Sequence, residues 1–165
     1  MIAYVVLGLV AVQRLAELAL ANRNTAALKA RGAVEVGAAH YPLVVGLHAA
    51  WLVAIAAFLP QPPSVHWPLL GLFLCLQALR VWVLASLGPY WTTRIITLPG
   101  APLVRRGPYR FLRHPNYLVV AAEIAVLPLV FGETAVAVAF SAVNAAVLFW
   151  RIRQEESALA ARRAA

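Results

Sequence analysis

Five long apolar runs fill most of the 165 residues, and they constrain the fold more than any other feature. They cover residues 2–21, 40–59, 67–87, 116–131 and 134–150. A helix needs roughly 20 mainly apolar residues to cross a bilayer. The chain is 63% apolar and 12% charged, whereas a soluble domain is about half apolar and about a quarter charged. The sequence therefore predicts an all-α integral membrane bundle of about five transmembrane helices.

The connections between the runs are short, so we expect residues 1–165 to form a single domain. A proline cluster at residues 60–63 ends the second run, because proline cannot continue a helix. Only Gly132 and Glu133 separate the last two runs, which predicts a tight antiparallel helical pair. We expect loops at residues 22–39 and a short polar tail from Arg151. Residues 88–114, rich in proline, glycine and arginine, should form an irregular cap on the membrane surface.

The basic residues indicate how the bundle lies in the membrane. Twelve of the 14 Lys and Arg residues fall in the segments 22–39, 88–114 and 151–165, and the loops at 60–66 and 132–133 hold none. Because cytoplasmic loops carry an excess of Lys and Arg, this distribution predicts the N-terminus outside and the C-terminus inside. The net charge of +8 is then mainly a topology signal, and we expect no nucleic-acid partner.

Four residues that are charged at neutral pH lie inside the predicted spans. Such a side chain costs roughly 2.5 to 3.5 kcal/mol at the bilayer centre, so each needs a partner or a function. Arg14 and Glu17 are three residues apart and can pair on one helical face. Arg80 and Glu123 have no opposite charge nearby in sequence. Glu123 could pair with Arg80 or Arg14 within the bundle, and Arg80 could instead snorkel to the inner surface.

A basic and aromatic stretch, residues 103–117, leads into the fourth run. It could be an ordinary interfacial anchor, with arginines on lipid phosphates and aromatic rings among the headgroups. His114 and Pro115 at a helix start could also present an imidazole and free N–H groups to a polar ligand. The hairpin of the last two spans should bring residue 114 close to residue 151.

Two sequence elements together resemble the isoprenylcysteine carboxyl methyltransferase family of integral-membrane enzymes that use S-adenosylmethionine. They are the run GPYRFLRHPNY at residues 107–117 and the run RIRQEE at residues 151–156. The resemblance covers about residues 76–159. The pieces at 41–48 and 90–94 look more like a bacterial branch that O-methylates alkylpyrones or alkylresorcinols.

The resemblance implies a binding site for S-adenosylmethionine, with S-adenosylhomocysteine as product, beneath the cytoplasmic cap. Arg80 stands where the family has an arginine that serves the acceptor, Arg151 resembles its partner, and Glu155 closes the pocket from the last helix. The implied catalytic residues are thus Arg80, Arg151 and Glu155. The implied cofactor-binding residues are Leu103, Val104, Tyr109, His114, Pro115, Tyr117 and Glu155.

The expected function is O-methylation of a lipophilic acceptor. A carboxylate acceptor, such as a prenylcysteine-like compound, needs no base and could be held by Arg80 and Arg151. A pyrone or resorcinol hydroxyl needs a base, for which Glu155, Glu123 or His114 are candidates. The alternatives are a phospholipid N-methyltransferase, a membrane reductase of the sterol type and a non-enzymatic membrane protein.

We expect the bilayer and a lipophilic small molecule as partners, with no obligate protein partner. The single cysteine, Cys75, leaves no multi-cysteine metal site, and we expect no metal. The expected location is a bacterial inner membrane, with the active site facing the cytoplasm.

Overall fold

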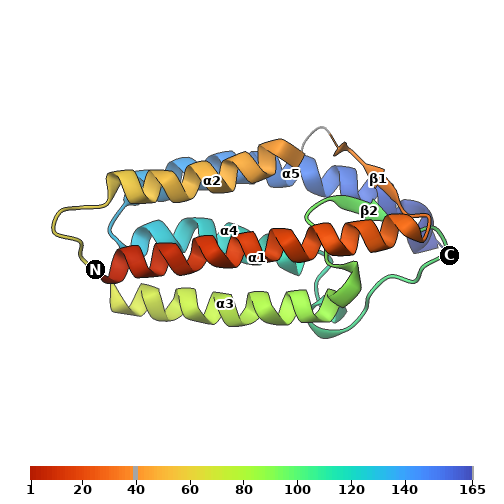
Figure 1. Ribbon diagram of the computed structural model, residues 1–165, viewed down its shortest axis with the longest axis horizontal. Coiled ribbons are helices and arrows are strands. Elements are labelled where there is room, and N and C mark those ends of the chain that lie inside the picture. Colours follow the sequence, from red (N-terminus) through yellow and green to blue (C-terminus); the bar gives the residue numbers. More distant parts are fainter. Residues whose placement is uncertain (39–40, 165) are drawn as a thin grey trace.

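The computed structural model describes residues 1–38 and 41–164, with side chains through Ala160. In this part of the chain, five α-helices run side by side as one elongated bundle (Figure 1). They are α1 (Ile2–Ala30), α2 (Tyr41–Phe58), α3 (Trp67–Leu87), α4 (Pro115–Val130) and α5 (Thr134–Ala164). The N- and C-termini lie at opposite ends of the bundle, as an odd number of crossings requires.

Four of these helices are long and apolar enough to cross a membrane, and α4 is shorter. Its 16 residues span about 24 Å at 1.5 Å per residue, less than the roughly 30 Å of a hydrocarbon core. Eight of the 16 are buried, so α4 is packed mainly against other helices. The predicted all-α membrane bundle is confirmed, and its orientation in the membrane stays a prediction.

Two helices are longer than the sequence predicted. Helix α1 continues from residue 21 to Ala30, through half of the predicted loop, because its polar face finds buried partners. The amide of Asn24 donates to the carbonyls of Gly88 and Trp91, at 3.2 and 2.9 Å. Helix α5 likewise continues through the predicted polar tail to Ala164. The predicted start of the second span, residue 40, lies outside the described residues.

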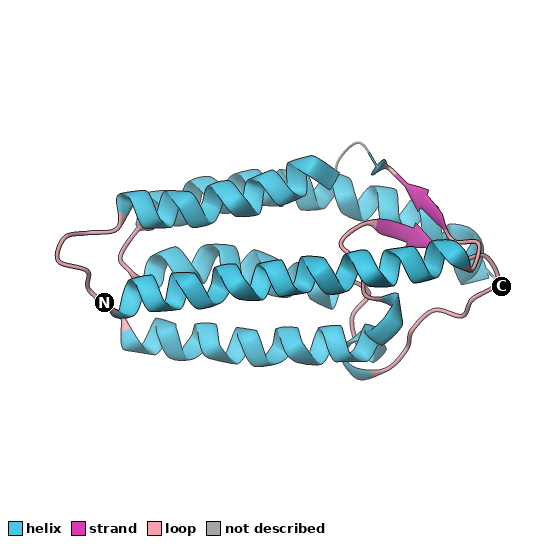
Figure 2. Ribbon diagram, viewed as in Figure 1, coloured by secondary structure: helices cyan, strands magenta, loops and turns pink. Residues whose placement is uncertain are grey.

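The cap is more ordered than predicted. Strand β1 (Val34–Val36) pairs with β2 (Ile95–Thr97) in a small antiparallel sheet (Figure 2). Glu35 ties the two strands to α1, because its carboxylate accepts from Lys29 at 2.5 Å and from Arg94 at 2.6 Å. These bonds lower the pKa of Glu35.

Two short 3₁₀ helices complete the cap, η2 (Gly88–Tyr90) and η3 (Gly107–Arg110). Gly107 has a φ of +56°, and a β-carbon there would lie 2.0 Å from the hydroxyl of Ser86. Glycine is therefore needed for η3 to dock on the end of α3.

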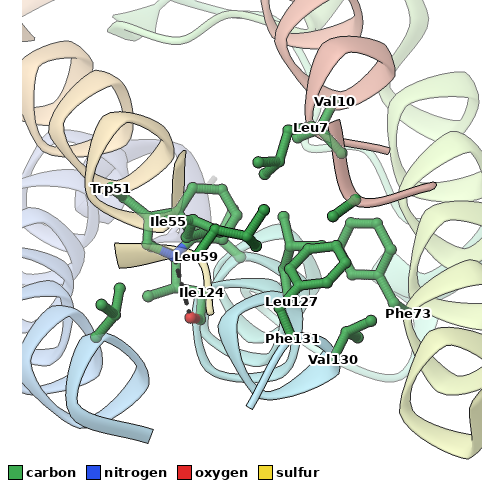
Figure 3. Packing of buried hydrophobic residues seen from close by; sticks show 13 residues of the cluster. Leu7, Val10, Trp51, Ile55, Leu59, Phe73, Ile124, Leu127, Val130 and Phe131 are labelled. Carbon is green, nitrogen blue, oxygen red and sulfur yellow. Dashed lines mark hydrogen bonds between the residues drawn. The ribbon is translucent and has the colours of Figure 1, made fainter. Parts of the chain in front are cut away.

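The apolar core fills the end of the bundle near the N-terminus. Figure 3 shows Trp51 and Ile55 of α2 packed against Ile124 and Leu127 of α4, with Phe73 of α3 alongside. The indole N–H of Trp51 donates to the carbonyl of Ile124 at 3.2 Å. Because this core occupies one end of the bundle, the buried charges and the cavities described next lie between it and the cap.

Candidate active site

A buried quartet of charges, formed by Arg14, Glu17, Arg80 and Glu123, connects α1, α3 and α4. Arg80 donates from Nε and Nη2 to the two carboxylate oxygens of Glu17, at 2.6 and 2.5 Å. It also donates from Nη1 to Glu123 at 2.9 Å. Arg14 reaches Glu17 at 3.1 Å and Glu123 at 2.7 Å. Two cations therefore face two anions, and the quartet is neutral.

The quartet settles the pairing alternatives for these residues. The predicted pair of Arg14 with Glu17 is confirmed, and Glu123 pairs with both arginines. Arg80 is only 5% exposed and points into the bundle, so the snorkelling alternative is wrong. Three of its five N–H donors are occupied by carboxylates.

Above the apolar core, a cavity of about 320 Å³ lies between α1, α2, α4 and α5, and we call it the membrane cavity. Most of its wall is apolar, with Leu15 and Leu18 from α1, Val44 and Leu52 from α2, and Leu148 from α5. Its polar side chains are Arg14, Glu17, His48, Arg80, Thr92, Thr93, Asn116, Tyr117, Asn144 and Arg151. This mixture suits an amphiphile with an apolar tail and a small polar head.

A second cavity of about 470 Å³ lies beneath the cap, and we call it the cap cavity. Six of the seven residues predicted to hold the cofactor line it, namely Leu103, Val104, Tyr109, His114, Tyr117 and Glu155. The seventh, Pro115, is buried as the first residue of α4 and is not part of the cavity wall. The structure thus brings together residues from the cap, α4 and α5.

The two cavities share one wall. Trp91, Thr92, Asn116, Tyr117 and Arg151 line both of them. The two cavities therefore adjoin each other at these five side chains.

Tyr117 and Arg151 form the hydrogen-bonded centre of this wall. The hydroxyl of Tyr117 donates to Glu155 and accepts from Nε of Arg151 at 2.9 Å. Nη2 of Arg151 donates to the carbonyl of Thr93 at 2.5 Å. These contacts confirm the predicted closeness of the start of α4 and the end of the last span. Arg153 faces away and is exposed, with its guanidinium 4.6 Å from the ring of Phe149.

His114 completes the wall of the cap cavity on the α4 side. Its ring stacks on that of Tyr117 at 5.5 Å, and its nitrogens lie 3.9 Å from Glu155 and 3.5 Å from Glu156. Burial, with a smaller effect of the Glu155 carboxylate, raises the pKa of Tyr109. Tyr109 therefore keeps its hydroxyl proton at neutral pH and can donate to a ligand.

Three polar atoms of the shared wall are buried and have no hydrogen-bond partner among the described residues. They are Nη1 of Arg151, Oδ1 of Asn116 and Nε1 of Trp91. Buried polar groups are nearly always paired in folded proteins, so unpaired ones in a cavity wall point to a polar ligand. The cap cavity also has the volume of an ordinary small-molecule site. The residues present thus fit a polar cofactor of moderate size.

The sequence model of the isoprenylcysteine carboxyl methyltransferase family matches residues 69–161, more than half of the chain. The chain belongs to the isoprenylcysteine carboxyl methyltransferase (ICMT) family. It is also 38% identical to the uncharacterized protein YpbQ of Bacillus subtilis, over 94% of this chain and 95% of that protein. An uncharacterized protein of Haemophilus influenzae is 29% identical over 88% of each chain. No solved structure gives a significant match.

The ICMT match supports a membrane methyltransferase. It covers the two cavities unequally. The matched residues include the cap from η2 onward, all of α4 and α5 through residue 161, and so nearly all of the cap cavity. Helices α1 and α2, which form much of the membrane cavity, lie outside the match.

Sequence reasoning missed Trp91, Thr92, Asn116 and His48 as wall residues. Asn116 stands inside the quoted motif, and Trp91 and Thr92 stand in the stretch at 90–94, so their positions were a usable signal.

Proposed function

We propose that this ICMT-family protein transfers a methyl group from S-adenosylmethionine, held in the cap cavity, to an oxygen of a lipophilic acceptor held in the membrane cavity. The observation that carries the proposal is the wall common to both cavities. A polar cavity beneath the cap and an apolar cavity between the helices meet at Tyr117 and Arg151, which suits one polar and one lipid-soluble reactant.

On the cofactor side, we assign binding to the residues that line the cap cavity together with the helix start at Pro115. Leu103, Val104 and the stacked rings of His114 and Tyr117 offer flat apolar surface to a purine. The Glu155 carboxylate offers an acceptor to the cofactor's ammonium or hydroxyl groups. S-adenosylmethionine, when bound, supplies a methyl group already activated by its sulfonium charge.

On the acceptor side, Arg151 is the side chain best placed to contact the reacting oxygen. It lines both cavities, and none of the described residues accepts a hydrogen bond from its Nη1. Arg80 also lines the membrane cavity, but most of its donors are bound to Glu17 and Glu123. We therefore assign Arg151 to contact with the acceptor oxygen. Arg80 is assigned to the polar part of the cavity wall, which contacts the acceptor's head.

The main task of these residues is positioning. Holding two reactants in line within one site can lower a barrier by about 7–11 kcal/mol in favourable cases. The bonds of Arg151 to Tyr117 and Thr93 fix its guanidinium in the wall that both cavities share. The apolar wall keeps the acceptor's tail in place and limits access of water to the transferred methyl group.

Transfer of an isotope-labelled methyl group to a bacterial lipid extract tests the proposal. Purified protein with labelled S-adenosylmethionine should place the label on a lipid-soluble product, and mass spectrometry should locate it on oxygen. A product labelled on nitrogen would identify phospholipid N-methylation instead. Absence of any labelled lipid, together with binding of NADPH, would point to the reductase alternative. We further propose that this site faces the cytoplasm from a bacterial inner membrane.

A further inference from the structure

His48 is a titratable side chain of the membrane cavity to which the proposed mechanism gives no role. It lies near the middle of α2, seven residues from the start of that helix, and it lines the membrane cavity. It stands on the part of the cavity that the ICMT match does not cover.

One hydrogen bond determines which nitrogen of His48 carries the proton. Nδ1 lies 2.9 Å from the carbonyl oxygen of Val44, one turn earlier in the same helix. A carbonyl can only accept, so Nδ1 is the donor and carries the hydrogen. In the neutral ring, Nε2 then has a free lone pair. No residue that the structure describes makes a hydrogen bond to Nε2.

The other candidate bases are already engaged or face elsewhere. Glu123 is 1% exposed, accepts from Arg14, Arg80 and Gln77, and is not part of either cavity wall. Glu17 faces the membrane cavity, but Arg80 occupies both of its oxygens.

The two remaining candidates belong to the cap cavity and not to the membrane cavity. Glu155 accepts a hydrogen bond from the hydroxyl of Tyr117, and His114 stacks on the Tyr117 ring. Within the membrane cavity, Nε2 of His48 is therefore the basic atom that remains available to an acceptor.

Charged groups from three other helices line the membrane cavity together with His48. Arg14 and Glu17 face the cavity from α1, Arg80 from α3 and Arg151 from α5, and α2 itself contributes no charge. The first three belong to the neutral quartet, so Arg151 is the one cation of the wall that a carboxylate does not balance directly. A cation beside the acceptor oxygen stabilises the oxyanion, and the lone pair on Nε2 can accept the hydroxyl proton.

We propose that Nε2 of His48 is the general base that takes the proton from a hydroxyl group of the acceptor. This inference rests on the proposed function. The O–H bond breaks with its proton passing to Nε2, and the oxygen forms a bond to the methyl carbon. The bond between that carbon and the sulfonium sulfur breaks, and its electron pair stays on sulfur. The imidazolium then releases its proton to water. The acceptor is accordingly a lipophilic phenol or enol and not a carboxylate, which needs no base.

Two substitutions separate the functions of the two ring nitrogens. In His48→Asn the amide can still donate to the Val44 carbonyl, but no atom of the shorter side chain takes the place of Nε2. In His48→Gln the amide reaches the Nε2 position and can accept a hydrogen bond, but it cannot take a proton. His66→Asn is the matched control, because His66 is an exposed residue outside both cavities.

The assays use 5-pentylresorcinol as a hydroxyl acceptor, its dimethyl ether as a ligand without a hydroxyl, and dodecanoate as a carboxylate acceptor. Loss of a general base lowers kcat by roughly 10²–10⁴-fold. We expect such a loss on pentylresorcinol in both His48 variants, shrinking as the pH approaches the ionisation of the phenol. His48→Asn should also weaken binding of pentylresorcinol measured without cofactor, His48→Gln should largely retain it, and binding of the dimethyl ether should not change.

Each outcome decides the inference. Equal kcat and equal pentylresorcinol affinity in wild type and His48→Asn would overturn it while leaving the proposed function in place. Methylation of dodecanoate in preference to pentylresorcinol by the wild type would also overturn it. Failure of the wild type to methylate any lipid would refute the proposed function instead. In that case, binding without turnover would still decide whether Nε2 contacts a hydroxyl: His48→Asn should lower the affinity for pentylresorcinol but not that for its dimethyl ether.

Discussion

Removing one member of the buried quartet should destabilise the bundle strongly. Arg80→Met leaves the carboxylates of Glu17 and Glu123 with Arg14 as their one cation. Breaking a buried ion pair by removing one partner costs about 3–5 kcal/mol, because an uncompensated charge stays buried. In a chain of this size 1 kcal/mol corresponds to roughly 2–4 °C, so the apparent Tm should fall by roughly 6–20 °C.

The double variant Arg80→Met/Glu17→Met is the informative comparison. It leaves Arg14 and Glu123 as a neutral pair, whose nitrogen and oxygen lie 2.7 Å apart. Replacing a whole buried pair with apolar side chains is often neutral. We therefore expect the double variant to recover most of the stability lost in either single variant.

The assay is thermal unfolding of the purified protein in one detergent, followed for wild type, both single variants and the double variant. A double variant whose loss equals the sum of the two single losses would refute the coupling. In that case the four charges would act independently, and the bonds within the quartet would not stabilise the bundle.

Three further predictions concern the cap, the wall and the far end of the bundle. Asn24→Leu should cost about 1–3 kcal/mol in chemical unfolding, because the carbonyl of Trp91 loses its donor and that of Gly88 keeps only the N–H of Trp91. Arg151→Lys should lower kcat/KM by roughly 10- to 100-fold through the lost Nε bond, while Arg153→Lys should have no effect in the same assay. Burial raises the pKa of Glu133 to about 7, so the folded chain keeps a proton that the unfolded chain releases near 4.5. Stability should therefore fall as pH rises across this interval, and Glu133→Gln should remove that dependence in unfolding measured at several pH values.

The membrane bundle could be predicted because its signal is local. Runs of apolar residues, the prolines at 60–63 and the two-residue connection at 132–133 act through chain segments near in sequence. The ends of α1 and α5 could not be predicted in this way. Asn24 looks like a loop residue in the sequence, and its helical position depends on carbonyls of residues 88 and 91.

In the candidate site, too, contacts between segments near in sequence could be predicted and contacts between distant segments could not. The closeness of His114 and Arg151 followed from the hairpin alone. The quartet could be predicted only in part, because Arg80 finds Glu17 across 63 residues and spacing along the chain carries no trace of that contact. His48 ends the stretch at 41–48 that carried part of the family resemblance, but it was not predicted as a site residue, because the sequence does not show the cavity beside it.

Binding of S-adenosylmethionine to the purified protein, measured by calorimetry, tests the central claim most directly. Wild type and Arg153→Ala should bind it with equal affinity, and His114→Ala and Glu155→Ala should bind it more weakly. A folded wild-type protein that gives no binding heat would contradict the claim, as would unchanged affinity in both cap-cavity variants.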